Sequence, residues 1–268
     1  MHVRVNGISL AYQDRGTGLP LIFLHAFPLN RTMWAPQEEA LSSRFRVITV
    51  DLRGHGESDA PLWHYTLDQA ADDVRALMDH LSIGQAVLVG LSMGGYILFS
   101  FYRRYPDRVK GLILADTKAQ ADTPDGRDAR FQMAQIAYRQ GPAAIADIML
   151  SKLLSPETIT AKPDLVRTVR SMIEGNQISG IAGDLMAMAE RPDSTPVLET
   201  MACPTQIIVG ERDQATPPSE AKFMADRIPR ARLTVIPDAA HLANVEQPDT
   251  FTQIVHVFAS DLEREKTA

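Results

Sequence analysis

The chain has 268 residues, of which 45% are hydrophobic and 22% are charged, as expected of a globular domain with a core of useful size. Its length suits one large α/β domain that carries an insertion. The formal net charge of −6 argues against a nucleic-acid partner, because phosphate binding requires a basic face.

The cysteine content and the apolar segments bear on the compartment of the protein. The single cysteine, Cys203, cannot form an intramolecular disulfide, which fits a reducing compartment, and we interpret it as a core or boundary thiol. The first residues lack the basic and apolar regions of a signal peptide, and no apolar segment approaches the roughly 20 residues that span a bilayer. We therefore expect a cytoplasmic protein with no membrane contact.

Short apolar segments predict the strands of a parallel sheet. Asn6 and Gly7 tolerate positive φ and separate two short alternating segments, which predicts a β-hairpin at the start of the chain. Further segments are almost wholly apolar, as in strands that helices cover on both faces. These segments span 21–24, 47–50, 86–89, 112–115 and 206–209, and another strand is expected at 233–236.

Helical patterns alternate with these strands. Apolar residues recur with a helical period over 67–81, and Thr66 with Gln69 predicts a capping box at the start of that helix. A later helix is expected to begin near Pro248. Strand and helix alternation of this kind indicates right-handed crossovers and a doubly wound sheet.

The alternation breaks between Asp116 and Pro204, where no convincing strand is found. Helical patterns punctuated by X-Pro pairs fill this stretch, at 131–138, 143–154 and 164–173. The sequence therefore predicts a helical cap lodged in one loop of the sheet. We expect residues 118–201 to form this cap, and residues 1–117 and 202–268 to form the core.

The stretch Gly-Leu-Ser-Met-Gly-Gly at 90–95 joins the strand at 86–89 to a helical pattern. A serine on such a tight turn has a strained backbone and close neighbours, so Gly90 and Gly94 remove side chains that would collide. The turn lifts the Ser92 hydroxyl above the carboxyl edge of the sheet. The alternative is a glycine-rich turn that only joins strand to helix.

Two later residues provide partners for Ser92. A serine hydroxyl is a weak nucleophile unless a base takes its proton and a third group orients the base. Asp213 and His241 follow successive strands, in the order serine, acid, histidine. Alone, an aspartate there is commonly a turn former and a loop histidine is commonly solvated, but the ordered combination favours a catalytic triad. Asp116 also ends a strand and is the alternative acid.

An oxyanion hole requires two N–H donors. The residue after the nucleophile, Met93, is expected to supply one, and Phe27 in the loop after the strand at 21–24 is expected to supply the other. The Phe27 side chain would also wall the acyl pocket. We interpret His25, which precedes Ser92 in the chain, as a loop-shaping residue.

Other residues are candidates for substrate contact. Trp34 either anchors the first helix or lines the pocket. Methionines of the predicted cap are either core filler or an adaptable apolar lid over the site, and the candidates are Met133, Met149 and Met186. The histidines lack metal-ligand spacing, so no metal and no cofactor are expected.

Several of these motifs resemble the α/β-hydrolases over nearly the whole chain. They are His-Ala-Phe-Pro at 25–28, Asp-Leu-Arg-Gly-His-Gly-Glu-Ser at 51–58, the segment 90–95, Gly-Glu-Arg-Asp at 210–213 and the loop of His241. Ala26 stands where the family usually has glycine. The chain is similar to carboxylesterases and to 3-oxoadipate enol-lactonase-like hydrolases. This resemblance implies a mostly parallel eight-stranded sheet with helices on both faces and a helical cap after the sixth strand. Asp51 and Arg53 are expected to stabilise the turn at 54–56.

Together these features predict a serine hydrolase that cleaves carboxylic esters of small to medium acyl groups through an acyl-enzyme on Ser92. Lactone hydrolysis uses the same residues and is the nearest alternative, with cofactor-free perhydrolysis as a side activity. A small-molecule receptor on the same fold is the alternative from another class. The expected partner is a small ester or lactone, and the oligomeric state is left open.

Overall fold

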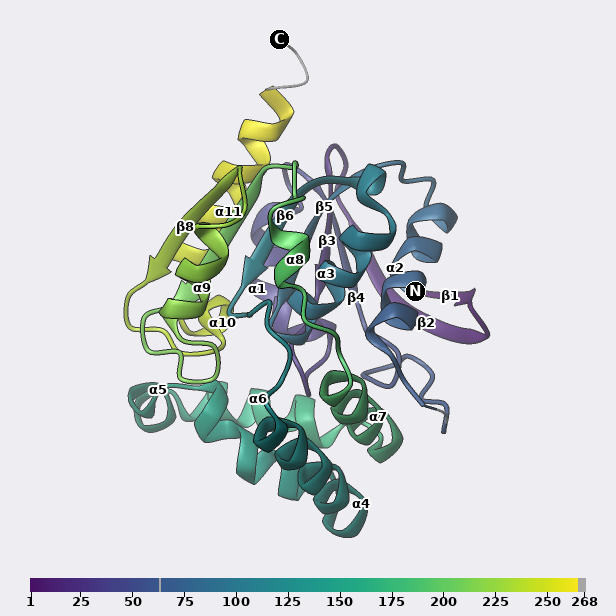
Figure 1. Cartoon of the computed structure of the whole chain (residues 1–268), viewed down its shortest axis with the longest axis vertical. Coiled ribbons are helices and arrows are strands. Elements are labelled where there is room, and N and C mark those ends of the chain that lie inside the picture. The colour runs from purple at the N-terminus through teal and green to yellow at the C-terminus, as the bar shows by residue number, and fades with distance from the viewer. Residues whose placement is uncertain (63, 265–268) are drawn as a thin grey trace.

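The computed structural model describes residues 1–62 and 64–264. Its centre is an eight-stranded sheet in the order β1-β2-β4-β3-β5-β6-β7-β8 (Figure 1). The first two strands pair antiparallel with their neighbours, and β3 to β8 run parallel, which confirms the predicted, mostly parallel sheet. The strands are β1 (His2–Val5), β2 (Ile8–Arg15), β3 (Pro20–Leu24), β4 (Arg46–Val50), β5 (Ala86–Leu91), β6 (Val109–Ala115), β7 (Thr205–Gly210) and β8 (Ala231–Ile236).

Local sequence accounts for the first hairpin and for the central strands. Asn6 and Gly7 both have positive φ, of 45° and 83°, at the turn between β1 and β2. Every residue of β5 and β7 is buried, as expected of strands covered on both faces. The interior of the sheet is therefore a rigid base for the loops at its carboxyl edge.

Helices cover both faces of the sheet (Figure 1). On one face α1 packs against α11, and on the other α2 packs against α3. Thr66 and Gln69 form the predicted capping box at the start of α2. These helices are α1 (Ala35–Leu41), α2 (Leu67–His80), α3 (Met93–Arg104), α9 (Pro218–Ala225) and α11 (Pro248–Arg264), with the short elements η1 (Arg31–Trp34), η2 (Pro106–Arg108) and α10 (Ala243–Glu246).

Five helices lie between β6 and β7, and α4 to α7 form a layer below the carboxyl edge of the sheet in Figure 1. They are α4 (Pro124–Leu153), α5 (Pro156–Ala161), α6 (Pro163–Glu174), α7 (Ile178–Ala189) and α8 (Thr195–Leu198). We call α4 to α8 the helical insertion. The predicted segments 131–138 and 143–154 both belong to α4, which is kinked at Gly141, where φ is 79° and ψ is 179°. Pro142 follows the kink and cannot donate the helical hydrogen bond.

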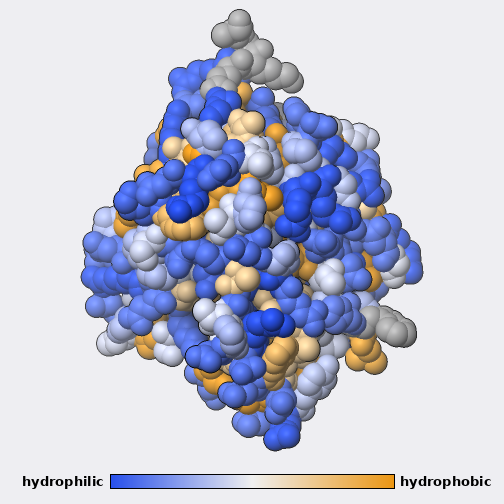
Figure 2. Space-filling model, viewed as in Figure 1, coloured by the Kyte–Doolittle hydropathy of each residue, from blue (hydrophilic) through white to orange (hydrophobic). Residues whose placement is uncertain are grey.

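The molecular surface is mainly hydrophilic on the face drawn in Figure 2, with scattered apolar patches. Within the described part of the chain, no helix combines the length and the apolarity that a membrane crossing requires.

The insertion contacts the core through glycines. A Cβ on Gly180 of α7 would overlap the backbone of Gly54, and a Cβ on Gly183 would press on the ring of Tyr65. Gly54 itself has a φ of 86°, which favours glycine. The backbones of α7 and of the turn at 54–56 are therefore in direct contact.

We expect Gly180→Ala to lower the free energy of unfolding by roughly 1–3 kcal/mol, because the added methyl group must push α7 away from Gly54. Gly84→Ala is the matched control, since a Cβ at Gly84 meets no atom within 4 Å. Its effect should be about 0.5 kcal/mol or less. Urea unfolding followed by circular dichroism measures both, and equal effects would contradict the close contact between α7 and the turn.

Candidate active site

Ser92 lies in a sharp turn between β5 and α3, with φ of 54° and ψ of −112°. This conformation is strained for a residue with a side chain. A Cβ on Gly90 would overlap Gly94, and a Cβ on Gly94 would overlap the carbonyl of Leu24. The Thr117 hydroxyl donates to the Ser92 carbonyl at 2.8 Å and braces the turn from the end of β6. Glycine is thus required at 90 and 94 because neighbouring backbone atoms leave no room for a side chain.

The structure brings Ser92, His241 and Asp213 together. His241 Nε2 lies 2.8 Å from Ser92 Oγ, and His241 Nδ1 lies 2.9 Å from Asp213 Oδ2. Asp213 follows β7 and His241 follows β8, and all three residues are buried. A carboxylate beside Nδ1 favours the tautomer with its proton on Nδ1, which leaves Nε2 free to accept the serine proton.

Asp213 is held as a carboxylate by its neighbours. Its Oδ1 accepts from the backbone N–H groups of Ala215 and Thr216, and its Oδ2 accepts from the Thr216 hydroxyl. Burial acts to raise the pKa of Asp213, but His241 and the Thr216 hydrogen bonds outweigh it, so the pKa lies below the ordinary value. Thr216 was not predicted from the sequence, although Asp-x-x-Thr after a strand is a spacing at which such side chains form local turns.

Asp116, the alternative acid, has a different set of contacts. Its carboxyl oxygens accept from the backbone N–H groups of Gly210, at 2.8 Å, and Ala243, at 3.4 Å. Burial and then the charge of Asp213 raise its pKa well above the ordinary value. The geometry therefore assigns Asp213 to His241, while Asp116 joins the end of β7 to the start of α10.

The loop of His241 is also held by Glu246, which is buried at the end of α10. Glu246 Oε2 accepts from the Ala240 N–H at 2.6 Å, directly before His241. Its Oε1 accepts from the N–H and hydroxyl of Ser155, between α4 and α5. One carboxylate thus joins the histidine loop to the helical insertion.

The two predicted oxyanion donors lie in different segments: Met93 directly follows Ser92, and Phe27 lies in the loop after β3. Met93 is the first residue of α3, and Phe27 lies in the loop at 25–30, where the Phe27–Pro28 bond is cis. Within residues 1–62 and 64–264, neither N–H has a hydrogen-bond acceptor. Ala26 is not among the residues with positive φ, so alanine fits this loop without strain.

His25 shapes this loop, as predicted. Its Nδ1 lies 3.0 Å from the Ala26 carbonyl, and its Nε2 accepts from the Leu52 N–H at 3.0 Å. The ring is fully buried and lies against the ring of His55, tilted by 57° with the centroids 5.1 Å apart. Burial lowers the pKa of His25 to about 4, against a smaller opposing effect of the hydrogen bond to Ala26. His25 is therefore neutral at ordinary pH, with a single tautomer that satisfies both nitrogens.

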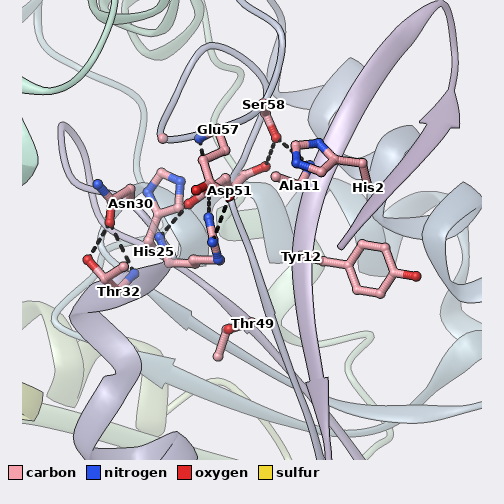
Figure 3. Close-up of polar contacts among 12 residues, drawn as sticks. His2, Ala11, Tyr12, His25, Asn30, Thr32, Thr49, Asp51, Glu57 and Ser58 are labelled. Atoms are coloured by element: carbon pink, nitrogen blue, oxygen red, sulfur yellow. Dashed lines mark hydrogen bonds and ion pairs between the residues drawn. The ribbon is translucent and has the colours of Figure 1, made fainter.

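Asp51 stabilises the turn that follows β4, as predicted (Figure 3). Its carboxylate accepts from the N–H groups of Arg31 and Glu57 and pairs with the Arg31 guanidinium. The Ser58 hydroxyl donates to the Asp51 carbonyl at 2.6 Å. Arg53 is instead bound to Asp73 of α2, at 2.7 and 2.8 Å. Asp51 thus joins this turn to the start of η1, which directly follows the loop that contains Phe27.

The structure corrects one candidate for substrate contact and leaves others as predictions. Trp34 is wholly buried, with its ring centroid 5.1 Å from that of Phe23 and 5.8 Å from that of Phe251. It packs between β3 and α11, so it belongs to the core rather than to a pocket. The methionines Met133, Met149 and Met186 are partly buried. Among the described residues, no group of three or more histidines, cysteines or acids is arranged to hold a metal ion.

A serine on a tight strand-to-helix turn, with an acid and a histidine after later strands of a mostly parallel sheet, defines the architecture of an α/β-hydrolase. The family model described as alpha/beta hydrolase fold matches residues 20–248, and the chain belongs to this family.

Individual relatives narrow the comparison. A thermophilic esterase from Thermogutta terrifontis is 43% identical, with a TM-score of 0.95 over 98% of this chain and 99% of that one. The enol-lactonase from Burkholderia xenovorans is 32% identical, with a TM-score of 0.91 over 97% and 100% of the two chains. The chain is also 33% identical to 3-oxoadipate enol-lactonase 2 of Acinetobacter baylyi, over 94% of this chain and 92% of the relative.

We expect the stability cost of His25→Gln to shrink as the pH falls from about 6.5 to about 4. In this window unfolded His25 binds a proton that the folded form rejects, so the histidine itself destabilises the wild type progressively and glutamine does not. The difference should amount to on the order of 1–3 kcal/mol. Urea unfolding of both proteins across this range measures it, and a constant difference would show that His25 titrates alike in both states.

Proposed function

We propose that the protein is a serine hydrolase that cleaves carboxylic esters of small to medium acyl groups through an acyl-enzyme on Ser92. The observation that carries this proposal is the hydrogen-bonded series from Ser92 Oγ to His241 Nε2, at 2.8 Å, and from His241 Nδ1 to Asp213, at 2.9 Å. The esterase and enol-lactonase relatives support the same class of reaction.

In the proposed mechanism, His241 takes the Ser92 proton as Oγ attacks the ester carbonyl. The carbonyl oxygen becomes an oxyanion, which the N–H groups of Phe27 and Met93 stabilise. His241 then gives its proton to the departing alcohol oxygen, and the carbon–oxygen bond breaks. Water, deprotonated by His241, then attacks the acyl carbon; the bond from this carbon to Ser92 Oγ breaks, His241 returns the proton to Oγ, and the acid is released. Asp213 stabilises the imidazolium that forms in both halves of the reaction.

We further propose that the helical insertion, within residues 118–201, is a cap that selects substrates. Ser92 and His241 are 9% and 4% exposed, and α4 to α7 lie below the carboxyl edge of the sheet (Figure 1), which supports a substrate route past the insertion. Phe27, at 5% exposed, would wall the acyl side of the pocket. The partly buried Met133, Met149 and Met186 are the proposed apolar lining from the cap.

Lactone hydrolysis is the second candidate, favoured by the two enol-lactonase relatives. The chemistry at Ser92 is the same, except that the leaving alkoxide stays attached to the acyl group. Perhydrolysis would follow if peroxide replaced water in deacylation. A small-molecule receptor would instead show slow turnover, and an acyl-chain series of p-nitrophenyl esters beside a panel of lactones separates these candidates.

Ser92→Ala should fold normally and lose roughly three or more orders of magnitude in kcat toward p-nitrophenyl acetate, because the nucleophile is removed. A fluorophosphonate probe should label the wild type at Ser92, as peptide mapping by mass spectrometry would show. Labelling at Cys203, or no labelling, would rule out the proposed mechanism.

The acid is tested by a pair of variants. Asp213→Asn should lower kcat by on the order of 10⁴-fold, because the amide favours the wrong tautomer of His241. Asp116→Asn is the matched control: Asp116 contacts the backbone N–H groups of Gly210 and Ala243 rather than His241, so we expect a loss in kcat below about tenfold. Reversed effects would identify Asp116 as the acid.

A further inference from the structure

Asn176 joins the helical insertion to the loop that carries the proposed oxyanion donor Phe27. It lies between α6 and α7 and is 4% exposed. Its partners in the core are more than a hundred positions away in the sequence, in two separate loops. It is therefore a contact between the insertion and the site rather than part of a local turn.

The amide of Asn176 uses both of its polar atoms. Nδ2 donates to the carbonyl of Pro28 at 2.7 Å, and it lies 3.3 Å from that of Leu29. It also donates to the carbonyl of Met172 in α6, the preceding helix, at 3.0 Å. Oδ1 accepts from the Gly56 N–H at 2.7 Å. One buried side chain thus binds the loop after β3 and the turn after β4 simultaneously.

The carbonyls that Asn176 binds belong to the two residues directly after Phe27. On the other side of Phe27, the Ala26 carbonyl accepts from Leu29 N–H, and the Ala26 N–H points to Met33 Sδ at 3.3 Å. The core therefore fixes the loop before Phe27, and the insertion fixes it after Phe27. The Phe27 N–H lies between these two attachments.

We propose that Asn176 is a positioning residue that sets the place of the Phe27 N–H in the oxyanion hole. This inference rests on the proposed function. An oxyanion donor is effective only within a narrow range of positions, and a displacement of about 1 Å can cost on the order of 10²-fold in rate. Without the Asn176 amide, the buried carbonyls of Pro28 and Leu29 lose their donor and the loop shifts to find other partners.

The alternative is that Asn176 merely docks the insertion on the core, and Ser179 provides a matched control for it. The Ser179 hydroxyl, in the first turn of α7, donates to the Ala60 carbonyl at 3.1 Å. It is another hydrogen bond between the insertion and the core, only three residues from Asn176. Ser179→Ala removes this docking contact and leaves the loop of Phe27 untouched.

The experiment compares Asn176→Ala and Ser179→Ala with p-nitrophenyl acetate as substrate and phenylboronic acid as inhibitor. We expect Asn176→Ala to lower kcat by about 10- to 100-fold with KM changed by less than about threefold, since the oxyanion forms only in the transition state. Affinity for phenylboronic acid, which forms a tetrahedral adduct on the serine, should fall in parallel. Ser179→Ala should change neither value by more than about twofold.

Equal effects of the two variants, or a loss of activity confined to KM, would overturn the proposal. If Asn176→Ala fails to fold by circular dichroism, Asn176→Ser is used, which keeps a hydroxyl at this position and should give a smaller loss of kcat in the same pattern. Ser92→Ala separates failure of the proposed function from failure of the proposed role of Asn176. An active Ser92→Ala overturns the proposed function, whereas an inactive one with a fully active Asn176→Ala overturns only the role of Asn176.

Discussion

The positive φ of Ser92 is the constraint on which the arrangement of the site depends. A residue with a side chain in this region of backbone space costs of order 1–3 kcal/mol, and the surrounding structure must hold it there. Ser92 N–H donates to the Ala115 carbonyl, and the Thr117 hydroxyl donates to the Ser92 carbonyl, so the end of β6 fixes both sides of the turn. Because β5 is wholly buried and has a strand on each side, the turn that follows it is held in place by the sheet.

A second constraint is electrostatic. Asp116 and Asp213 lie at the ends of neighbouring strands, and two adjacent buried carboxylates would repel each other. The two carboxyl groups have different partners: Asp213 contacts the His241 ring and accepts three further hydrogen bonds, whereas Asp116 accepts from two backbone N–H groups. The site therefore places one carboxylate beside His241, while the second carboxyl, whose pKa is raised, connects two loops.

Most of the core and the hydrogen-bonded series at the site could be predicted from local sequence. The parallel strands are short and apolar because both their faces are covered, and Ser92, Asp213 and His241 each follow such a strand. The insertion was harder to predict. Helix α7 contains Gly180 and Gly183, and glycine weakens a helical sequence pattern. These positions are occupied by glycine because the helix lies against the core there, not because of the local backbone conformation. Trp34 and Asn176 show the same limit, since burial against α11 or a bond to Pro28 depends on tertiary packing.

The insertion leaves the sheet after β6 and returns at β7, and these strands are neighbours. Its length and sequence can therefore vary without changing strand order or register, which makes the insertion a separable part of the fold. The contacts of Glu246 with Ser155 and of Asn176 with Pro28 limit that exchange. A replacement insertion would have to supply donors at both places, so these two junctions restrict which insertions are compatible with this core.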